Sequence, residues 1–251
     1  YNKSMPFLFE KIDDYTELLM PDDLLSAGSI LQATREAMTE ETCRDVEVIG
    51  WLYQFYISEK KDEVFASKKK IQPEDIPAAT QLFTPHWIVR YLVENSLGRL
   101  WLLNRPGSKL VEQMDYYIKP EQAETDFLHI AKPEEIKICE PACGSGHMLT
   151  YAFDLLYAIY EEEGYEPAEI PEKILTNNLY GIEIDERAGE LAAFALTMKA
   201  RAKQRRFFNK GVKPNICVLE NVHFDEDELK NYMDFVGRDL FAAPLQTTLR
   251  K

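Results

Sequence analysis

The chain has 251 residues, of which 45% are hydrophobic and 12% aromatic, so it is long and apolar enough to fold around a core. No apolar run approaches the ~18–20 residues that span a bilayer, and no basic-then-apolar leader opens the chain, so a cytoplasmic protein without membrane contact is expected. The four cysteines fit neither a metal-ligand spacing nor a disulfide scaffold, so no metal is expected.

The net charge of −14 argues against binding nucleic acid by bulk electrostatics, because neutralising phosphates requires lysine and arginine. One segment differs, since no acid occurs between Glu190 and Glu220. The basic residues of this segment are Lys199, Arg201, Lys203, Arg205, Arg206, Lys210 and Lys213. We interpret them either as a solvated helix face or as a phosphate-facing surface.

The first 71 residues predict a helical N-terminal region, and residues 72–251 a second domain. Residues 46–56 (VEVIGWLYQFY) are strongly apolar, and a charged stretch follows at 59–70. The aromatic residues Trp51, Tyr53, Phe55 and Tyr56 are expected to pack in a core rather than to stack on nucleic-acid bases. No residue of this region suggests chemistry.

Residues 72–80 hold two prolines and predict a connector. A helix follows, with Thr84 as its expected N-cap and Pro85 at the first helical position, where a missing N–H has no cost. Apolar residues then repeat at helical spacing as far as Leu100. This segment is either an ordinary capped helix or a site where the Thr84 hydroxyl and unpaired N–H groups meet a ligand carboxylate.

Residues 136–149 (IKICEPACGSGHML) are the centre of the chain. A short strand over 136–139 reaches Glu140, and an amphipathic helix begins after Gly146. The small residues between them allow backbone N–H groups to approach a ligand closely, at the positive end of a helix dipole. The segment therefore predicts either a nucleotide-binding loop or an ordinary strand-to-helix turn.

Two more strands are expected at residues 179–185 (LYGIEID) and 215–219 (NICVL), with a helix over 186–206 between them. Strands that alternate with helices predict an α/β fold with a parallel, doubly wound sheet, which binds ligands at the carboxyl ends of its strands. The polar residues at these strand ends are Glu140, Glu183, Asp185, Glu220 and Asn221. Either Glu183 or Asp185 fits the acid that accepts both ribose hydroxyls of a nucleotide.

A dinucleotide-dependent oxidoreductase is one alternative. Its G-x-G-x-x-G loop would place a third glycine where Leu149 stands, and Glu183 lies 37 residues beyond Gly146 instead of about 20. Both departures count against this reading. A second alternative is a non-catalytic interaction module, with the helical N-terminus and the basic segment docking a partner protein or DNA.

Three segments resemble signatures of N6-adenine DNA methyltransferases. EPACGSG (140–146) is similar to their first signature, FTPHWIV (83–89) to their Thr-Pro signature, and YGIEID (180–185) to their second-strand signature. The Thr-Pro segment precedes the glycine loop, as it does in one amino-methylating class. The likeness covers roughly residues 82–221, and it is greatest to the large methylases of BREX/Pgl phage-defence systems and type IIG restriction–modification enzymes.

The resemblance implies a Rossmann-like methyltransferase sheet that binds S-adenosyl-L-methionine. Thr84, beside Pro85, would contact the methionine carboxylate. The residues that would enclose the methionine moiety are Glu140, Ala142, Cys143, Gly144, Ser145 and Gly146. Amino methylation needs no covalent enzyme intermediate, so Cys143 is expected to be a small packed residue and not a nucleophile.

The other half of the cofactor site is implied in the same way. Glu183 matches the acid that binds the ribose hydroxyls, because it follows Gly181 and Ile182, and Ile184 would pack on the adenine ring. Glu220 or Asn221 would accept a hydrogen bond from the exocyclic amine of the cofactor.

Methyltransferases of this kind act on a flipped adenine, which an Asn-Pro-Pro-aromatic loop holds. None of the thirteen prolines adjoins another, so that loop, and with it any catalytic residue, is expected to be missing. We therefore expect a fragment, the cofactor half of a longer protein, that binds S-adenosylmethionine but does not methylate DNA alone. Double-stranded DNA and restriction or phage-defence subunits would be partners of the parent protein, and the first strand would be a sheet edge.

Overall fold

A computed structural model describes residues 2–19, 21–24, 26–44, 48–82, 84–220, 225, 227, 228 and 230–232. Residues 1–219 form one compact unit and residues 220–251 another. The sequence also predicts a helix over 225–236. Of these residues, 227, 228 and 230–232 are helical, 225 is not, and the others lie outside the described residues. No described helix is both long and apolar enough to cross a membrane.

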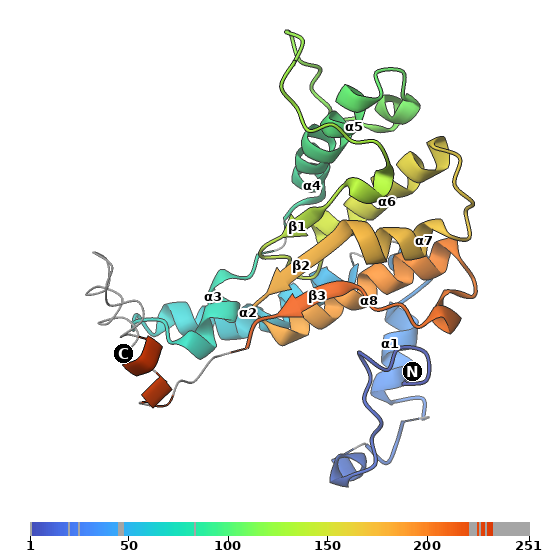
Figure 1. The fold of residues 1–251 in the computed structure, drawn as a ribbon. Coiled ribbons are helices and arrows are strands. Elements are labelled where there is room, and N and C mark those ends of the chain that lie inside the picture. Colours follow the sequence, from blue (N-terminus) through green and yellow to red (C-terminus); the bar gives the residue numbers. More distant parts are fainter. Residues whose placement is uncertain are drawn as a thin grey trace. The chain divides into compact units, whose positions relative to one another are not determined.

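Three parallel strands form the sheet of the first unit, in the order β1-β2-β3 (Figure 1). They are β1 (Ile138–Glu140), β2 (Leu179–Glu183) and β3 (Asn215–Val218). The expected parallel α/β arrangement is therefore confirmed, and β1 is an edge of the sheet among the described residues. The complete Rossmann-like topology stays a prediction.

Two long helices, α6 (His147–Glu162) and α8 (Glu186–Lys203), cover one face of the sheet (Figure 1). They approach it closely because glycines line the contact. A Cβ on Gly181 of β2 would lie 3.1 Å from a methyl of Leu149 in α6, and one on Gly189 of α8 would lie 2.7 Å from Val218 of β3. The connection from β1 to β2, which contains α6, and the connection from β2 to β3, which contains α8, therefore lie on the same side of the sheet.

The opposite face of the sheet is open among the described residues. A hollow of about 590 Å³ lies along it, lined by side chains of all three strands that include Cys139, Tyr180 and Cys217. Both cysteines are exposed. Parallel sheets are usually covered on both faces, whereas this face carries no covering helix among the described residues.

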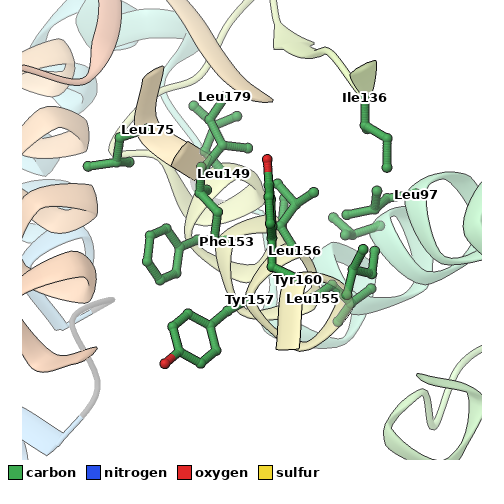
Figure 2. Close-up of a cluster of buried hydrophobic side chains, with 14 of the residues drawn as sticks. Leu97, Ile136, Leu149, Phe153, Leu155, Leu156, Tyr157, Tyr160, Leu175 and Leu179 are labelled. Carbon is green, nitrogen blue, oxygen red and sulfur yellow. The ribbon is translucent and has the colours of Figure 1, made fainter. Parts of the chain in front are cut away.

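The hydrophobic core centres on α6 (Figure 2). Leu149, Phe153, Leu156 and Tyr160 recur every three or four residues, so one stripe of the helix faces the sheet, and each is almost fully buried. The short helix α7 (Ile170–Lys173) and a π-helical turn, η7 (Ile174–Asn178), continue this core into β2.

The helix expected after Thr84 is one continuous rod in three parts: α4 (His86–Val93), a π-helical turn η4 (Glu94–Gly98) and α5 (Arg99–Asn104). It packs on α6 through a buried stripe made of Val89, Val93, Leu97 and Trp101. The rod runs in the same direction as α6, because His86 lies beside Tyr151 near the start of α6 and Trp101 donates to Glu162 at its end.

Two asparagines of this rod, Asn95 and Asn104, bind the backbone on either side of the polar loop at residues 119–127. Each amide bonds to one backbone carbonyl and one backbone N–H of the loop segment, and its Nδ2 also donates to a carbonyl of its own helix. The four bonds to the loop segment are Asn95 Nδ2 to Tyr116 O (2.8 Å), Ile118 N to Asn95 Oδ1 (2.8 Å), Asn104 Nδ2 to Leu128 O (2.9 Å) and Ile130 N to Asn104 Oδ1 (2.8 Å).

The N-terminal region is helical and irregular, as expected. Its elements are η1 (Tyr15–Leu19), α1 (Ile30–Ala37), η2 (Thr42–Arg44), α2 (Val48–Ala66), η3 (Pro73–Asp75) and α3 (Ile76–Thr80). The connector expected over 72–80 contains the two short helices η3 and α3, and Pro73 and Pro77 lie at the first and second positions of them, where proline needs no N–H partner. The domain boundary at residue 71 stays a prediction.

The expectation that the aromatics of residues 51–56 pack in a core is wrong for three of them, of which Trp51 is 37% exposed. Phe55 and Tyr56 are 75% and 68% exposed. The helix α2 runs on through the charged stretch to Ala66, so only one side of the apolar run faces the protein. Trp51 lies against His147, with ring centroids 5.9 Å apart, and Tyr53 is half-buried.

The remaining elements are short. They are η5 (Lys109–Gln113), η6 (Pro133–Glu135) and η8 (Phe207–Lys210). In the basic segment, Lys199 bonds to Asp154 at 2.6 Å and Lys210 to Glu172 at 2.5 Å, while Arg201 lies over a phenylalanine ring. Part of that segment therefore binds its own chain.

Asn178 ties the start of β2 to the segment before β1. Its fully buried amide accepts from the Tyr160 hydroxyl (2.9 Å) and donates to the carbonyls of Pro133 (2.8 Å) and Ile136 (2.9 Å). Asn178→Ala leaves these three groups unsatisfied, so we expect it to lower the free energy of unfolding by about 2–4 kcal/mol in urea titrations. The neighbouring Asn177→Ala is the control, with an expected loss below about 1 kcal/mol; equal losses would contradict the assignment.

Candidate functional site

The glycine loop joins the end of β1 to the start of α6. Gly144 and Gly146 both have positive φ angles, 53° and 85°, which side chains disfavour. The N–H of Cys143 donates to the carbonyl of Ile182 in β2 (2.9 Å), so the loop crosses towards the second strand. A Cβ on Gly146 would lie 3.0 Å from the Cβ of Ala192, so the loop is also pressed against α8.

Glu183 joins this loop to the end of β2. Its carboxylate is buried and accepts three backbone hydrogen bonds. Oε2 accepts from Gly144 N–H (2.6 Å), while Oε1 accepts from Ile184 N–H (2.8 Å) and Asp185 N–H (3.1 Å). The structure therefore brings together the acid of the second strand and the glycine loop, which lie far apart in the sequence.

Glu140 is a second carboxylate at the same edge of the sheet. It ends β1 and is paired in register with Gly181, two residues before Glu183. Burial raises the pKa of Glu140, with no compensating hydrogen bond from the described residues. A half-buried acid without a partner is typical of a ligand-binding site.

Cys143 lies between these two acids. Burial, together with the charges of Glu183 and Glu140, raises the pKa of its thiol to about 12. The side chain is 6% exposed and belongs to the hydrophobic core. The expectation that Cys143 is a packed residue is confirmed, because such a thiol stays protonated and is a poor nucleophile at neutral pH.

The other loop residues divide into exposed and buried ones. Ala142 is exposed, and the apolar side chain of Ile184, next to Glu183, is 49% exposed. Ser145 is 3% exposed, and its Oγ has no hydrogen-bond partner among the described residues. That oxygen faces Gly50 of α2, where an added Cβ would lie 2.4 Å from it.

Thr84 is not the N-cap of the helix that follows it. That position belongs to Pro85, whose carbonyl accepts from Ile88 N–H (2.9 Å) and Val89 N–H (3.1 Å), and α4 begins at His86. The rigid proline shifts the helix start by one residue relative to the prediction. The helix nevertheless begins beside the first turn of α6, since the His86 and Tyr151 rings are 6.3 Å apart.

A buried network that the sequence did not predict holds α4 on α6. Glu94 is 0% exposed and accepts from the Tyr151 hydroxyl (2.6 Å), Arg90 Nε (3.2 Å) and Tyr116 N–H (2.5 Å). The only signal in the sequence is an acid four residues after Arg90 in an otherwise apolar helix. This network fixes the direction in which the Thr84–Pro85 segment enters the rod.

The last predicted positions follow β3. Glu220 is exposed, and Asn221 lies outside the described residues. The N–H of Leu219 still donates to the carbonyl of Glu183 (2.8 Å), so β2 and β3 end side by side. The roles expected for these two residues stay predictions.

Comparisons with known proteins find methyltransferases. Residues 121–217 match the family model of the MmeI DNA-methyltransferase domain. The chain is 51% identical over 240 residues to the adenine-specific methyltransferase BrxX of Escherichia coli O9:H4 (strain HS), and 42% identical over 248 residues to the adenine-specific methyltransferase PglX of Lacticaseibacillus casei (strain Zhang). The chain is a relative of these adenine-specific methyltransferases.

Each of these alignments covers 92% of this chain and 20% of the relative. The chain therefore spans about a fifth of the length of the curated relatives it matches. A more distant likeness, 24% over 180 residues, is to a putative type II restriction enzyme and methyltransferase of Methanocaldococcus jannaschii; it covers 63% of this chain and 14% of that protein. All three relatives carry the word methyltransferase in their names, as the resemblance of the three signatures led us to expect.

Two features of Gly146 disfavour a side chain at this position: its positive φ angle and its close contact with α8. Their costs can be measured separately. Gly164 has a similar φ of 81° but nothing within 4 Å of an added Cβ. We expect Gly164→Ala to lower the free energy of unfolding by about 1–2 kcal/mol, from backbone strain alone. Gly146→Ala should cost about 2–4 kcal/mol in the same denaturant titration, because Ala192 must also move. Equal losses would show that the loop does not press on α8.

Glu140 should make the stability of the fold depend on pH. Its folded pKa is raised above the ordinary 4.5, so the folded state binds the proton more tightly, and stability falls as pH rises through that interval. Glu140→Gln removes the buried charge and should raise the melting temperature at about pH 7, with the difference vanishing below about pH 4. The exposed Glu112→Gln is the control; a Glu140→Gln effect of the same size at both pH values would exclude this explanation.

Proposed function

We propose that this chain supplies the S-adenosyl-L-methionine-binding part of an adenine-specific (N6) DNA methyltransferase of a phage-defence or restriction–modification system. The observation that carries the proposal is the 2.6 Å hydrogen bond between the Glu183 carboxylate and the N–H of Gly144. It unites, at the carboxyl edge of a parallel sheet, the two features that a nucleoside site in such a sheet requires. The relationship to BrxX and PglX supports the same reading.

The residues of this edge fit the chemistry of the cofactor. At Gly144 and Gly146, both with positive φ, the loop has no side chain, so its backbone can approach the methionine part closely. Glu183 would accept from the ribose hydroxyls, and the exposed side chain of Ile184 would cover one face of the adenine ring. The half-buried Glu140 supplies an acceptor for a donor of the ligand, such as the methionine ammonium.

The remaining assignments follow the family pattern. Thr84, with Pro85, would contact the methionine carboxylate beside the start of α4. Ala142, Cys143 and Ser145 would form the wall of the loop. Glu220 or Asn221 would accept from the exocyclic amine of the cofactor.

The three N–H groups already on Glu183 constrain how it binds the ribose. An ionised carboxylate offers about four lone-pair sites, and three are occupied. One hydroxyl can therefore bind without rearrangement, while a second must displace a backbone N–H. When bound, S-adenosylmethionine supplies an electrophilic methyl group, and this chain's residues orient it.

The chemistry on DNA belongs, in this proposal, to other parts of a longer protein. None of the thirteen prolines adjoins another, so no Asn-Pro-Pro-aromatic loop is available here to hold a flipped adenine. We propose that the longer protein provides that loop, the recognition of double-stranded DNA and the contacts to restriction or phage-defence subunits.

Calorimetric titration tests the cofactor assignment. The chain should bind S-adenosylmethionine and S-adenosylhomocysteine, and NAD far more weakly. Glu183→Gln retains the shape of the side chain but loses a charge-assisted acceptor, so we expect it to weaken S-adenosylhomocysteine binding at least about tenfold. The control is Glu112→Gln, an exposed acid of η5, which should bind as the wild type does.

Circular dichroism should show that the Glu183→Gln variant is folded. Tighter binding of NAD than of S-adenosylmethionine by the wild type would favour the oxidoreductase alternative. Unchanged affinity in a folded Glu183→Gln variant would remove the acid from the site.

A further inference from the structure

The helix α2 of the N-terminal region reaches the proposed cofactor site through one side chain. The Tyr53 hydroxyl donates to Oδ2 of Asp185 at 2.5 Å, across 132 positions of sequence. Asp185 immediately precedes α8, and its other oxygen, Oδ1, accepts from Arg187 N–H (3.2 Å) as the N-cap of that helix. The aspartate is therefore fixed from both sides.

Three hydrogen bonds then connect Tyr53 to the glycine loop. The first joins the Tyr53 hydroxyl to the Asp185 carboxylate. The second joins Asp185 N–H to Oε1 of Glu183 (3.1 Å), and the third joins Oε2 of Glu183 to Gly144 N–H (2.6 Å). Each acceptor is a carboxylate, and such charge-assisted bonds are stronger than neutral ones.

The backbone of α2 touches the same region one turn earlier. A Cβ on Gly50 would lie 2.4 Å from Ser145 Oγ and 2.5 Å from His147 Nε2, so only glycine allows this approach. The adjacent Trp51 ring lies 5.9 Å from the His147 ring. Since α2 also packs beside α8, it contacts both the glycine loop and the turn after β2 (Figure 1).

The Tyr53 hydroxyl keeps its proton in the ordinary pH range. Burial, followed by the bond to Asp185, raises the pKa of Tyr53 well above its usual value, so the hydroxyl remains a donor. The bond is thus a constant structural constraint on the turn at residues 183–185. That turn carries both the proposed ribose acid and the proposed adenine contact.

We propose that Tyr53 is a positioning residue of the cofactor site. Through Asp185, it holds the turn at residues 183–185 in the orientation that presents the Glu183 carboxylate to the ribose hydroxyls. The N-terminal helical region is thus part of the site and not an appendage to it. This inference rests on the proposed function, and it adds a residue and an element that the three signatures do not contain.

Tyr53→Phe tests the role by removing one oxygen and keeping the ring. The affinity for S-adenosylhomocysteine, measured by calorimetry, should fall about three- to tenfold, because Glu183 is less well oriented. Binding of 2′-deoxy-S-adenosylhomocysteine, which lacks a ribose hydroxyl, should change less than about twofold. A merely structural role would weaken both ligands equally. The control is Tyr56→Phe, since Tyr56 stacks on Tyr53 but is exposed.

Asp185→Asn provides a second, independent variant. Asparagine caps helices as well as aspartate does, so α8 should remain intact. If Tyr53 acts through Asp185, adding Tyr53→Phe to Asp185→Asn should weaken S-adenosylhomocysteine binding less than Tyr53→Phe alone does.

The outcomes separate this inference from the function on which it rests. A wild-type chain that binds neither ligand overturns the proposed function, and the positioning role with it. A wild type that binds, with Tyr53→Phe unchanged or equally impaired for both ligands, overturns the positioning role alone.

Discussion

The carboxylate of Glu183 is the interaction on which the site depends. Three backbone N–H groups converge on it, one from the glycine loop and two from the turn after β2. A buried carboxylate with fewer partners would have a large uncompensated desolvation cost. The glycine loop and the turn after β2 must therefore both keep their N–H groups directed at Glu183. The strand that carries Glu183 is the central one of the described sheet, flanked by β1 and β3. The position of Glu183 is therefore fixed by the sheet, and the hydrogen bond from Tyr53 to Asp185 links the turn after it to α2 of the N-terminal region.

Glycines allow the helices α6 and α8 to pack closely on the sheet and on the glycine loop. Gly181 and Gly189 remove side chains where α6 and α8 meet the sheet, and Gly50 and Gly146 do so where α2 and α8 meet the loop. Such close contacts transmit displacement, because well-packed interiors have little free volume. A displacement of α2 is therefore expected to move the loop, although α2 contains none of the three segments that resemble methyltransferase signatures.

The local sequence signals predicted the α/β half well. Strands at 179–185 and 215–219 and helices after Gly146 and Asp185 were found within a few residues, because alternation of short β-branched runs with amphipathic stretches is a local property. The N-cap of α4 was predicted one residue too early, at Thr84, because the sequence does not distinguish it from Pro85. The aromatics of α2 were misjudged because an apolar run does not reveal which of its sides meets the protein. The bonds from Tyr53 to Asp185 and from Tyr151 to Glu94 span 132 and 57 positions, and no local pattern encodes them.

The paired asparagines of the rod suggest how this domain tolerates variation. Asn95 and Asn104 hydrogen-bond to the backbone just before and just after residues 119–127, so they fix where this segment leaves the rod and where it returns. Within it, Arg99 of α5 pairs with Glu124. Lengthening or replacing the excursion leaves the helix, the core and the sheet edge untouched, because loop closure depends only weakly on length. A longer or different segment would still leave and return at the same two asparagines, so an insertion is expected to be accepted here.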